Sequence, residues 1–586
     1  MQAFFLLLQR VNIQVQISRR QKKNTQHLPD PLHPRLKQIY ADRGVEDIAQ
    51  LNRSAKALLH YDQLQGVDKA VSLLAQAIAT NKKIMIVGDF DADGATSTAL
   101  CMMSLRMMGS TNHDYLVPNR FNFGYGLSPE IVEVAAQQHS QLIMTVDNGI
   151  ACFAGVEKAK SLGITVIVTD HHLAAESLPI ADAIVNPNQP GCGFLSKNLA
   201  GVGVAFYLML ALRAQLKSNG WLAKQGLPVP NLADFLDIVA LGTVADVVPL
   251  DENNRILVHQ GLQRIRSDKC RPGIQAIIEV AGKEKSRLVA SDLGFVVGPR
   301  LNAAGRLDDM SLGIECLITD DPARARQIAV QLDSLNRERR EIEGSMQQEA
   351  VKALEGLNLD ASTLPYGLVL YRADYHQGVI GILAGRIKDK YYRPTIAFAH
   401  QDDDTLKGSA RSIPGLHIRD LLEEISSRYP DIITKFGGHA MAAGLSLPLK
   451  NLSAFEQVFH QIAEENLKGK PLAGELISDG ELQAEEFTLA FAQCLKEAGP
   501  WGQGFPEPLF DGEFQLMDHR LVGSKHLKMT LKLDGGVLID AIAFNVDLAQ
   551  WPNPKCSHVN LAYKLDINEF RGRTSLQLMV EGVIAL

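Results

Sequence analysis

The sequence is poor in cysteine, and its cysteines form no paired motif. Seven cysteines are scattered over 586 residues, none belongs to a C-x-x-C pair, and the count is odd. A structural zinc site of the common kind needs closely spaced cysteine pairs, and a disulfide framework needs an even set. We therefore expect neither, and we expect the reducing conditions of the cytoplasm.

The sequence also lacks long hydrophobic runs and a strong excess of one charge. The apolar stretch in "MQAFFLLLQR" is far shorter than the roughly 20 residues of a membrane span, and no basic residue precedes it as in a signal peptide. The net charge of −7 argues against a uniformly basic coat for nucleic acid but permits a locally basic groove. We expect no membrane segment, and we expect the polar, basic leader at residues 1–36 to be poorly ordered.

What the sequence does contain is the composition of an ordinary globular protein, with 46% hydrophobic and 21% charged residues. Its length suggests about three or four domains. Residues 37–260 alternate continuous apolar runs such as "KIMIVGD", "QLIMTVD" and "ITVIVTD" with amphipathic segments. This alternation predicts a parallel sheet with helices on both faces and ligands at the carboxyl ends of its strands.

The rest of the chain divides into three further regions. Residues 261–355 are helical in pattern and include an unbroken stretch from Ala323 to Glu343, which is typical of a helix bridging two domains or equally of a surface helix. Residues 356–465 return to an α/β pattern. Residues 466–586 contain about five alternating runs separated by turn residues, which predict a small β-barrel of the OB type.

Three aspartates, Asp89, Asp91 and Asp93, follow the first apolar run in "GDFDADG". In an extended segment their side chains would point to one side and attract a hard divalent cation. An EF-hand loop is disfavoured because its twelfth position is Leu100 and a strand precedes it. An aspartyl-phosphate phosphatase motif and a solvated acidic turn that caps a helix both stay open for this stretch alone.

More acids and two histidines occur at matching positions of later segments. Asp147 ends "QLIMTVD", Asp170 ends "ITVIVTD" directly before His171 and His172, and Asp246 lies within the very apolar "ALGTVADVVPL". Strand ends of one parallel sheet converge, and a carboxylate in apolar surroundings needs a partner. Carboxylates with histidine and no cysteine suit Mn²⁺ or Mg²⁺. There are enough ligands for two such ions, which indicates hydrolysis of a phosphoester.

These residues carry a resemblance to a known family. The strings "DFDADG", "VDNG", "TDHH" and "ALGTVADVVPL", in that order, resemble the motifs of the DHH phosphoesterase superfamily. Further strings, among them "GPRLNAAGRL", "GSARSIPGLHI", "FGGHAMAAGLSL" and "PWGQGFPEPLFDG", are similar to the bacterial single-strand-specific 5′→3′ DNA exonucleases of that superfamily. The resemblance covers nearly the whole chain from about Lys37 onward.

The resemblance implies an α/β fold with a parallel-sheet DHH catalytic domain, a long connecting helix, a smaller α/β DHH-associated domain that binds substrate, and a C-terminal OB-like barrel that binds single strands. It implies two divalent cations, with Asp147 as the best candidate to bridge them. Asp170 and His172 would support the ligands or contact a phosphate. The implied metal ligands are Asp89, Asp91, Asp93, Asp147, His171 and Asp246. The implied catalytic residues are Asp147, His171, His172 and Asp246.

Substrate contacts follow from the same resemblance. Arginines near a serine could bind a terminal 5′-phosphate, and a Gly-Gly-His turn could let backbone amides approach a phosphate. The alternative for each arginine is a structural ion pair. The implied contacts are Arg300, Asn302, Arg306, His376, Ser409, Arg411, Gly437, Gly438 and His439.

The function implied by the resemblance is a metal-dependent exonuclease that degrades single-stranded DNA from its 5′ end to nucleoside 5′-monophosphates. We expect it to act as a monomer in recombination and repair, beside a single-strand-binding protein and a helicase. One alternative is a related phosphodiesterase for nanoRNA or cyclic dinucleotides, which would not need the C-terminal barrel. Another is an inactive replication scaffold, but such relatives lose metal ligands and this chain keeps them all.

Overall fold

The structure is a computed structural model that divides into two compact units. The first unit comprises Lys22–Arg337 with Leu495–Glu507, and the second comprises Met1–Gln21, Glu338–Cys494 and Pro508–Leu586. The described residues are 16–30, 32–119, 126–356, 364–470, 472–533, 535–548, 550–570 and 572–586. Among their helices, none combines the length and the apolar character that crossing a membrane requires.

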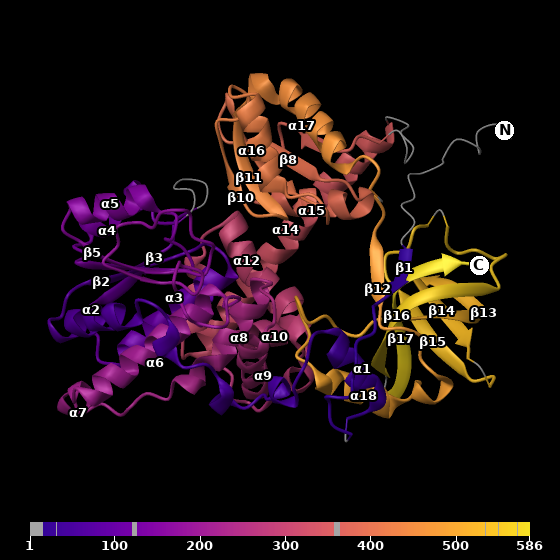
Figure 1. The fold of residues 1–586 in the computed structure, drawn as a ribbon, viewed down its shortest axis with the longest axis horizontal. Helices are drawn as coiled ribbons and strands as arrows, with labels where there is room; N and C mark the ends of the chain where they lie inside the picture. Colours follow the sequence, from indigo (N-terminus) through magenta and orange to yellow (C-terminus); the bar gives the residue numbers. More distant parts are fainter. Residues whose placement is uncertain are drawn as a thin grey trace. The chain divides into compact units, whose positions relative to one another are not determined.

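The first unit is built on a five-stranded parallel sheet, as the alternating pattern predicts (Figure 1). Its strand order is β3-β2-β4-β5-β6. The strands are β2 (Ile84–Gly88), β3 (His113–Leu116), β4 (Leu142–Val146), β5 (Thr165–Thr169) and β6 (Ala183–Val185). Both β2 and β4 are buried along their whole length, which is why they read as continuous apolar runs.

Helices cover both faces of this sheet. One face packs against α4 (Pro129–Gln137) and α5 (Phe153–Ser161), with Met85, Val132 and Val156 in the shared core. On the other side lie α2 (Val67–Ala79), α3 (Ala92–Met107) and α6 (Gly201–Ser218), of which α3 and α6 pack directly on one another. The sheet therefore presents the carboxyl ends of its strands at one edge, where a ligand can reach them.

A helical region completes the first unit. Its helix α8 packs on α3, α6 and α9. The apolar "ALGTVADVVPL" segment therefore lies against the helices that cover the sheet. The elements are α8 (Leu236–Ala245), α9 (Glu252–Arg266), α10 (Pro272–Val280), a π-helix (Leu293–Val297), α12 (Gly298–Leu307) and α13 (Ser311–Ile318). The predicted long helix is α14 (Pro322–Gly356), and the division between the two units falls within it.

The second unit contains the second α/β domain. Its mixed sheet has the order β10-β11-β9-β8-β7. The strands are β7 (Leu368–Tyr371), β8 (Thr395–His400), β9 (Thr405–Arg411), β10 (Lys435–Gly438) and β11 (Ala442–Pro448). One core includes α16 (Ile418–Arg428) and α17 (Leu452–Leu467), and a separate core includes α15 (Ile380–Tyr391) and part of α14.

The leader differs from the expectation of poor order over residues 1–36. Residues 1–15 lie outside the described part of the chain, but Gln16–Arg19 form β1, which pairs in parallel with β12 (Glu475–Ser478). The guanidinium of Arg19 donates two hydrogen bonds to Asp511, 2.7 and 3.0 Å long. The expectation was wrong for this segment, because its partners lie hundreds of residues away.

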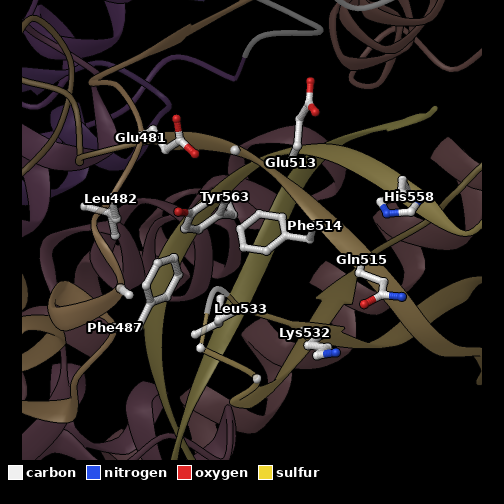
Figure 2. A pocket seen from close by; sticks show the side chains of 14 residues that line it. Glu481, Leu482, Phe487, Glu513, Phe514, Gln515, Lys532, Leu533, His558 and Tyr563 are labelled. Atoms are coloured by element: carbon white, nitrogen blue, oxygen red, sulfur yellow. The ribbon is translucent and has the colours of Figure 1, made fainter.

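The C-terminal runs form a closed five-stranded barrel of order β13-β14-β15-β17-β16, as predicted. The strands are β13 (Phe510–Val522), β14 (His526–Lys532), β15 (Leu538–Ala543), β16 (His558–Phe570) and β17 (Arg573–Ala585). A pocket opens on this barrel, and Figure 2 shows the rings of Phe487, Phe514 and Tyr563 turned toward one another inside it. Lys532 and His558 lie on its rim.

Candidate active site

The first acidic motif sits where β2 gives way to α3. The Asp91 carboxylate caps α3 by accepting hydrogen bonds from the amides of Asp93 and Gly94, at 2.9 and 3.0 Å. Asp93 therefore lies in the first helical turn. The expectation that all three aspartates share one side of an extended segment was wrong, because the extended conformation ends at Asp91.

Asp93 is buried against the start of α6. Its two carboxylate oxygens accept hydrogen bonds from the amides of Gly201 and Val202, at 2.6 and 2.9 Å, in place of a capping side chain on α6 itself. Burial and the nearby charge of Asp91 raise the pKa of Asp93 to about 7, although the two amides act in the opposite direction. A Cβ at Gly201 would lie 2.6 Å from the Cβ of Asp147, so the approach of α6 requires glycine there.

Asp147 follows β4 directly and has a left-handed backbone, with φ of 62°. Only 1% of the residue is exposed, and its Oδ1 lies 3.1 Å from Nε2 of His171. Burial, and then the charges of Asp93 and Asp91, raise the pKa of Asp147 well above its usual range. A non-glycine residue in this conformation costs free energy, and such strain is typical of functional sites.

Asp170 holds the two histidines that follow it. Its Oδ1 accepts hydrogen bonds from the amides of His171 and His172 and from Nδ1–H of His172, the last at 2.7 Å. Burial alone would raise the pKa of Asp170, but the hydrogen bond and charge of His172 lower it. Burial alone would lower the pKa of His172, but Asp170, then Asp89 and Asp91, raise it to about 9. The raised pKa favours the protonated, positively charged ring of His172.

Two asparagines that we did not predict fix the same backbone. The side-chain amide of Asn186 donates to the carbonyl of His172 at 2.9 Å, and that of Asn188 donates to the carbonyl of His171 at 2.6 Å. Both come from the "NPN" turn after β6. The turn composition was visible in the sequence, but nothing local to it indicated which backbone the side chains would reach.

Asp246 is the C-cap residue of α8, and its carboxylate lies close to the imidazole of His171. Its Oδ2 lies 3.4 Å from Nε2 of His171. This oxygen is buried, and it accepts no hydrogen bond from any described residue. Burial, and then the charge of Asp93, raise the pKa of Asp246 well above its usual range.

These side chains form three groups. Within each group, the potential ligand atoms lie within 4.8 Å of one another. The groups are Asp93, His171 and Asp246; Asp89, Asp91 and Asp147; and Asp147, His171 and His172. Crowded buried carboxylates repel one another unless a cation or a proton neutralises them. Carboxylate oxygens together with histidine nitrogens fit Mn²⁺ or Mg²⁺. The first two groups are linked through Asp147 and His171, which share the third group, and together they fit a pair of ions.

Helix α12 supports the first acidic loop. Oδ1 of Asn302 accepts a hydrogen bond from the amide of Ala92 at 2.8 Å, and a Cβ at Gly305 would lie 1.9 Å from the carbonyl oxygen of Phe90. Asn302, predicted as a substrate contact, thus also positions the loop that carries Asp91. Arg306, predicted for the same role, lies half-buried on this helix.

Arg300 is placed differently from the prediction that it binds substrate. It is 8% exposed, its guanidinium lies 2.9 Å from Oδ1 of Asp333, and its Nη1 donates to the carbonyl of Val296 at 2.6 Å. The guanidinium is already bound to a carboxylate and a carbonyl, an arrangement that favours the structural ion pair. The phosphate contact of Arg300 stays a prediction.

The second unit brings Ser409 and Arg411 together at the start of α15. They lie on one side of β9, and Nη1 of Arg411 donates to Oγ of Ser409 at 3.1 Å. A Cβ at Gly381, in the first turn of α15, would lie 2.8 Å from Nη2 of Arg411. Burial lowers the pKa of Arg411, and no carboxylate among the described residues forms an ion pair with it. A desolvated arginine beside a helix N-terminus is an arrangement suited to an anion.

The remaining predicted contacts flank this arginine. Ala442, next to the Gly-Gly-His turn, pairs with Arg411 across β11 and β9, and Gly438 has φ of 147°. The amide of His439 donates to the carbonyl of Ala442 at 2.8 Å, which closes the turn between β10, where Gly437 and Gly438 lie, and β11. His376 precedes α15, where its Nδ1 accepts from the amide of Gly378 at 3.1 Å.

Models of three known domain families match the chain. Residues 83–243 match the N-terminal domain of the DHH family, residues 365–465 match the DHHA1 domain, and residues 478–582 match the RecJ OB domain. The three matches fall on the parallel-sheet domain, the second α/β domain and the barrel. The mixed α/β architecture with a C-terminal OB barrel is therefore confirmed.

Known proteins resemble the chain along nearly its whole length. It is 57% identical over 571 residues to the single-stranded-DNA-specific exonuclease RecJ of Escherichia coli, covering 97% of this chain and 99% of that protein. It is 33% identical to RecJ of Bacillus subtilis, covering 97% of this chain and 70% of that protein. A crystal structure of Thermus thermophilus RecJ with Mn²⁺ has a TM-score of 0.77 and 28% identity, covering 98% of this chain and 80% of that one. A second, with Mg²⁺, has a TM-score of 0.72. With such identity over such length, the chain belongs to the family of the single-stranded-DNA-specific exonuclease RecJ.

Proposed function

We propose that the protein is a metal-dependent exonuclease that hydrolyses single-stranded DNA from its 5′ end and releases nucleoside 5′-monophosphates. The observation that carries the proposal is the convergence of Asp89, Asp91, Asp93, Asp147, His171 and Asp246 within the first unit. Manganese- and magnesium-bound structures of a family member support the same cations here. When bound, two such ions activate water and neutralise charge on a phosphodiester.

His172 is our candidate for the group that binds the scissile phosphate. Its Nδ1–H is held by Asp170, so Nε2–H is directed elsewhere, and a third of the side chain is exposed. With its pKa raised to about 9, the ring carries a positive charge at neutral pH. A charge-assisted hydrogen bond from Nε2–H to a phosphate oxygen follows from this arrangement.

The 5′-terminal phosphate is assigned to the second unit. Arg411 has no carboxylate partner among the described residues, Ser409 offers a hydroxyl beside it, and both lie near the first turn of α15, whose dipole favours an anion. His376, Gly437, Gly438 and His439 are the other proposed contacts. Recognition of a terminal phosphate would require the strand to bind by its 5′ end and would thereby set the direction of digestion.

The barrel is proposed to hold the single strand beyond the cleavage site. Its pocket is lined by the half-buried ring of Phe487, which can contact a base, and by Lys532, which can contact a backbone phosphate, while Phe514 and Tyr563 pack beneath them as core (Figure 2). The pocket supports a polymeric substrate over a cyclic dinucleotide, which would need no additional barrel. We did not predict these pocket residues from the sequence.

The setting of the reaction is also part of the proposal. We place the protein in the cytoplasm, which its seven free cysteines support, and in DNA recombination and repair as a monomer beside a helicase and a single-strand-binding protein. We also propose that the domains divide near residues 260, 355 and 465. Each of the three matched family domains lies within one of the resulting segments.

A comparison of end-blocked strands tests the direction of the reaction. One single strand carries a bulky block at its 5′ end and an otherwise identical strand carries it at its 3′ end, with a blunt duplex as the third substrate. The 3′-blocked strand should be digested with Mn²⁺ to mononucleotides, and the other two should persist. Equal digestion of both blocked strands would overturn the direction, and rapid digestion of the duplex would overturn the preference for single strands.

A further inference from the structure

The loop that carries Asp246 is strained and must be held by its surroundings. Asp246 ends α8, and the next residue, Val247, has φ of 61° although it is β-branched and 63% exposed. A β-branched side chain in the left-handed region is a true outlier, and such strain persists only where other contacts fix the backbone. Val247 itself is too exposed to supply those contacts through its side chain.

The contacts that hold the loop converge on Pro249 and Leu250, three and four residues after Asp246. The amide of Leu250 donates to the carbonyl of Gln503 at 2.7 Å, and its carbonyl accepts from Nη1 of Arg255 at 2.9 Å. The carbonyl of Pro249 accepts from the side chain of Asn254 at 3.0 Å. Two of these partners belong to α9, and the third, Gln503, comes 253 positions after Leu250 in the chain.

That distant segment, residues 495–507, packs as a strap within the first unit. The ring of Phe505 lies beneath the guanidinium of Arg255, 4.3 Å from it, so the strap also orients the side chain that binds Leu250. Gly502 approaches the loop so closely that a Cβ there would lie 2.7 Å from Cδ1 of Leu250. A Cβ at Gly504 would lie 3.1 Å from Cβ of Pro249.

The strap is itself anchored on its far side. Tyr40 donates from its hydroxyl to the carbonyl of Ala498 at 2.9 Å, and Arg53 donates to the carbonyls of Glu497 and Ala498 at 2.7 and 2.6 Å. Near its end, Arg43 donates to the carbonyl of Pro506 at 2.7 Å. A backbone carbonyl of the strap accepts each of these hydrogen bonds. The strap is therefore held in place between these anchors and the Asp246 loop.

We propose that this strap positions the metal ligand Asp246, with Phe505 and Arg255 as the residues through which it acts. The inference rests on the proposed ligand role of Asp246. The strap begins in the last turn of α18 (Leu489–Ala498) and leads, through Pro508 and Leu509, into the barrel strand β13. The covalent chain thus joins the single-strand-binding barrel to a segment that fixes one side of the metal centre.

Binding of Mn²⁺ to the full-length, metal-stripped protein in the absence of DNA tests this inference. Phe505→Leu removes the ring beneath Arg255, and Phe505→Tyr keeps a ring there. Outer residues that orient a ligand typically affect metal affinity by about 10- to 100-fold, so we expect Phe505→Leu to weaken Mn²⁺ binding by roughly tenfold or more. Phe505→Tyr should bind Mn²⁺ close to the wild-type level. Free Mn²⁺ is counted by electron paramagnetic resonance during a titration.

Phe235→Leu is the matched control. Phe235 is a buried phenylalanine beneath an arginine, Arg271, at 5.3 Å, but it lies at the opposite end of α8 from Asp246. This variant should lose thermal stability and keep its Mn²⁺ affinity. Unchanged Mn²⁺ binding by Phe505→Leu, or an equal loss in Phe235→Leu, would overturn the positioning role. A wild-type chain that binds no Mn²⁺ would instead overturn the metal centre itself, so the two failures are distinguishable.

Discussion

Nδ1 of His172 lies 2.7 Å from Oδ1 of Asp170, and this contact raises the pKa of the imidazole. Asp170→Asn keeps an oxygen for the two backbone amides but removes the negative charge. The pKa of His172 should then fall from about 9 toward the ordinary value near 6.5. The affinity for single-stranded DNA should be measured in EDTA as a function of pH. The contribution of the His172 cation to that affinity should disappear at a lower pH in Asp170→Asn than in the wild-type protein.

His172→Gln provides the control for that experiment. It should flatten the same part of the pH profile, because no titrating group is left at this position. An Asp170→Asn profile that superimposes on the wild-type profile would show that Asp170 does not govern the charge of His172.

Removal of the metal should make stability depend on pH in an unusual direction. The pKa of Asp93 is raised to about 7, and those of Asp147 and Asp246 are also raised, so the metal-free folded state binds protons more tightly than the unfolded chain. The stabilising contribution of Asp93 is complete below the unfolded pKa near 3.9 and is lost as pH rises through about 7, and the raised pKa values of Asp147 and Asp246 act in the same direction. In EDTA, the melting temperature should therefore be lower at about pH 8 than at about pH 6.

Calorimetry with Mn²⁺ in place of EDTA completes that comparison. The cation neutralises the carboxylates, so the stabilisation by Mn²⁺ should be larger at the higher pH. A metal-free melting temperature that rises between the two pH values would contradict the arrangement of buried acids described here.

Arg411 should determine the preference for a phosphorylated 5′ end. Arg411→Ala removes a charged donor from the site at the start of α15, and hydrogen bonds to charged groups are worth about 1.5–3 kcal/mol. Wild-type protein should digest a 5′-phosphorylated strand faster than a 5′-hydroxyl strand. The variant should lose roughly tenfold or more of that preference. An unchanged ratio of the two rates of digestion would remove Arg411 from phosphate recognition.

Arg300 should behave as a structural residue. Arg300→Ala removes the buried partner of Asp333 and leaves it paired with the exposed Arg337, so we expect a loss no larger than about 3–5 kcal/mol, the cost typical of a broken buried pair. Urea denaturation should show this loss, while the preference for a 5′-phosphate should remain. Full stability combined with a lost 5′-phosphate preference would restore the substrate role expected from the sequence.

Sequence patterns indicated much of the acidic cluster because its residues lie at positions that a parallel sheet fixes. Asp147 and Asp170 each end a continuous apolar strand, and strands of one sheet deliver their last residues to one edge. Asp246 was visible as a single charge in an apolar run. The barrel was likewise predictable, because five alternating runs separated by turns have few other solutions.

Features that depend on partners distant in the sequence were missed or misread. Arg300 looked like a phosphate ligand because its partner Asp333 lies on a different helix. The contact between Gln503 and Leu250 gives no local signal at all. We expected Asp93 in an extended segment. That expectation failed because Asp91 caps α3, so the helix starts earlier than the spacing alone indicated.

The most direct test of the account is Mn²⁺-dependent release of mononucleotides from a single strand by an Asp147→Asn variant. Asparagine tolerates the left-handed backbone found at this position, so the variant should fold and keep its melting temperature in EDTA at low pH. Loss of the carboxylate shared by two ligand groups should reduce the rate by roughly a thousandfold, since metal-ion stabilisation is worth several kcal/mol. A folded variant that still releases nucleotides at close to the wild-type rate would contradict the metal centre proposed here.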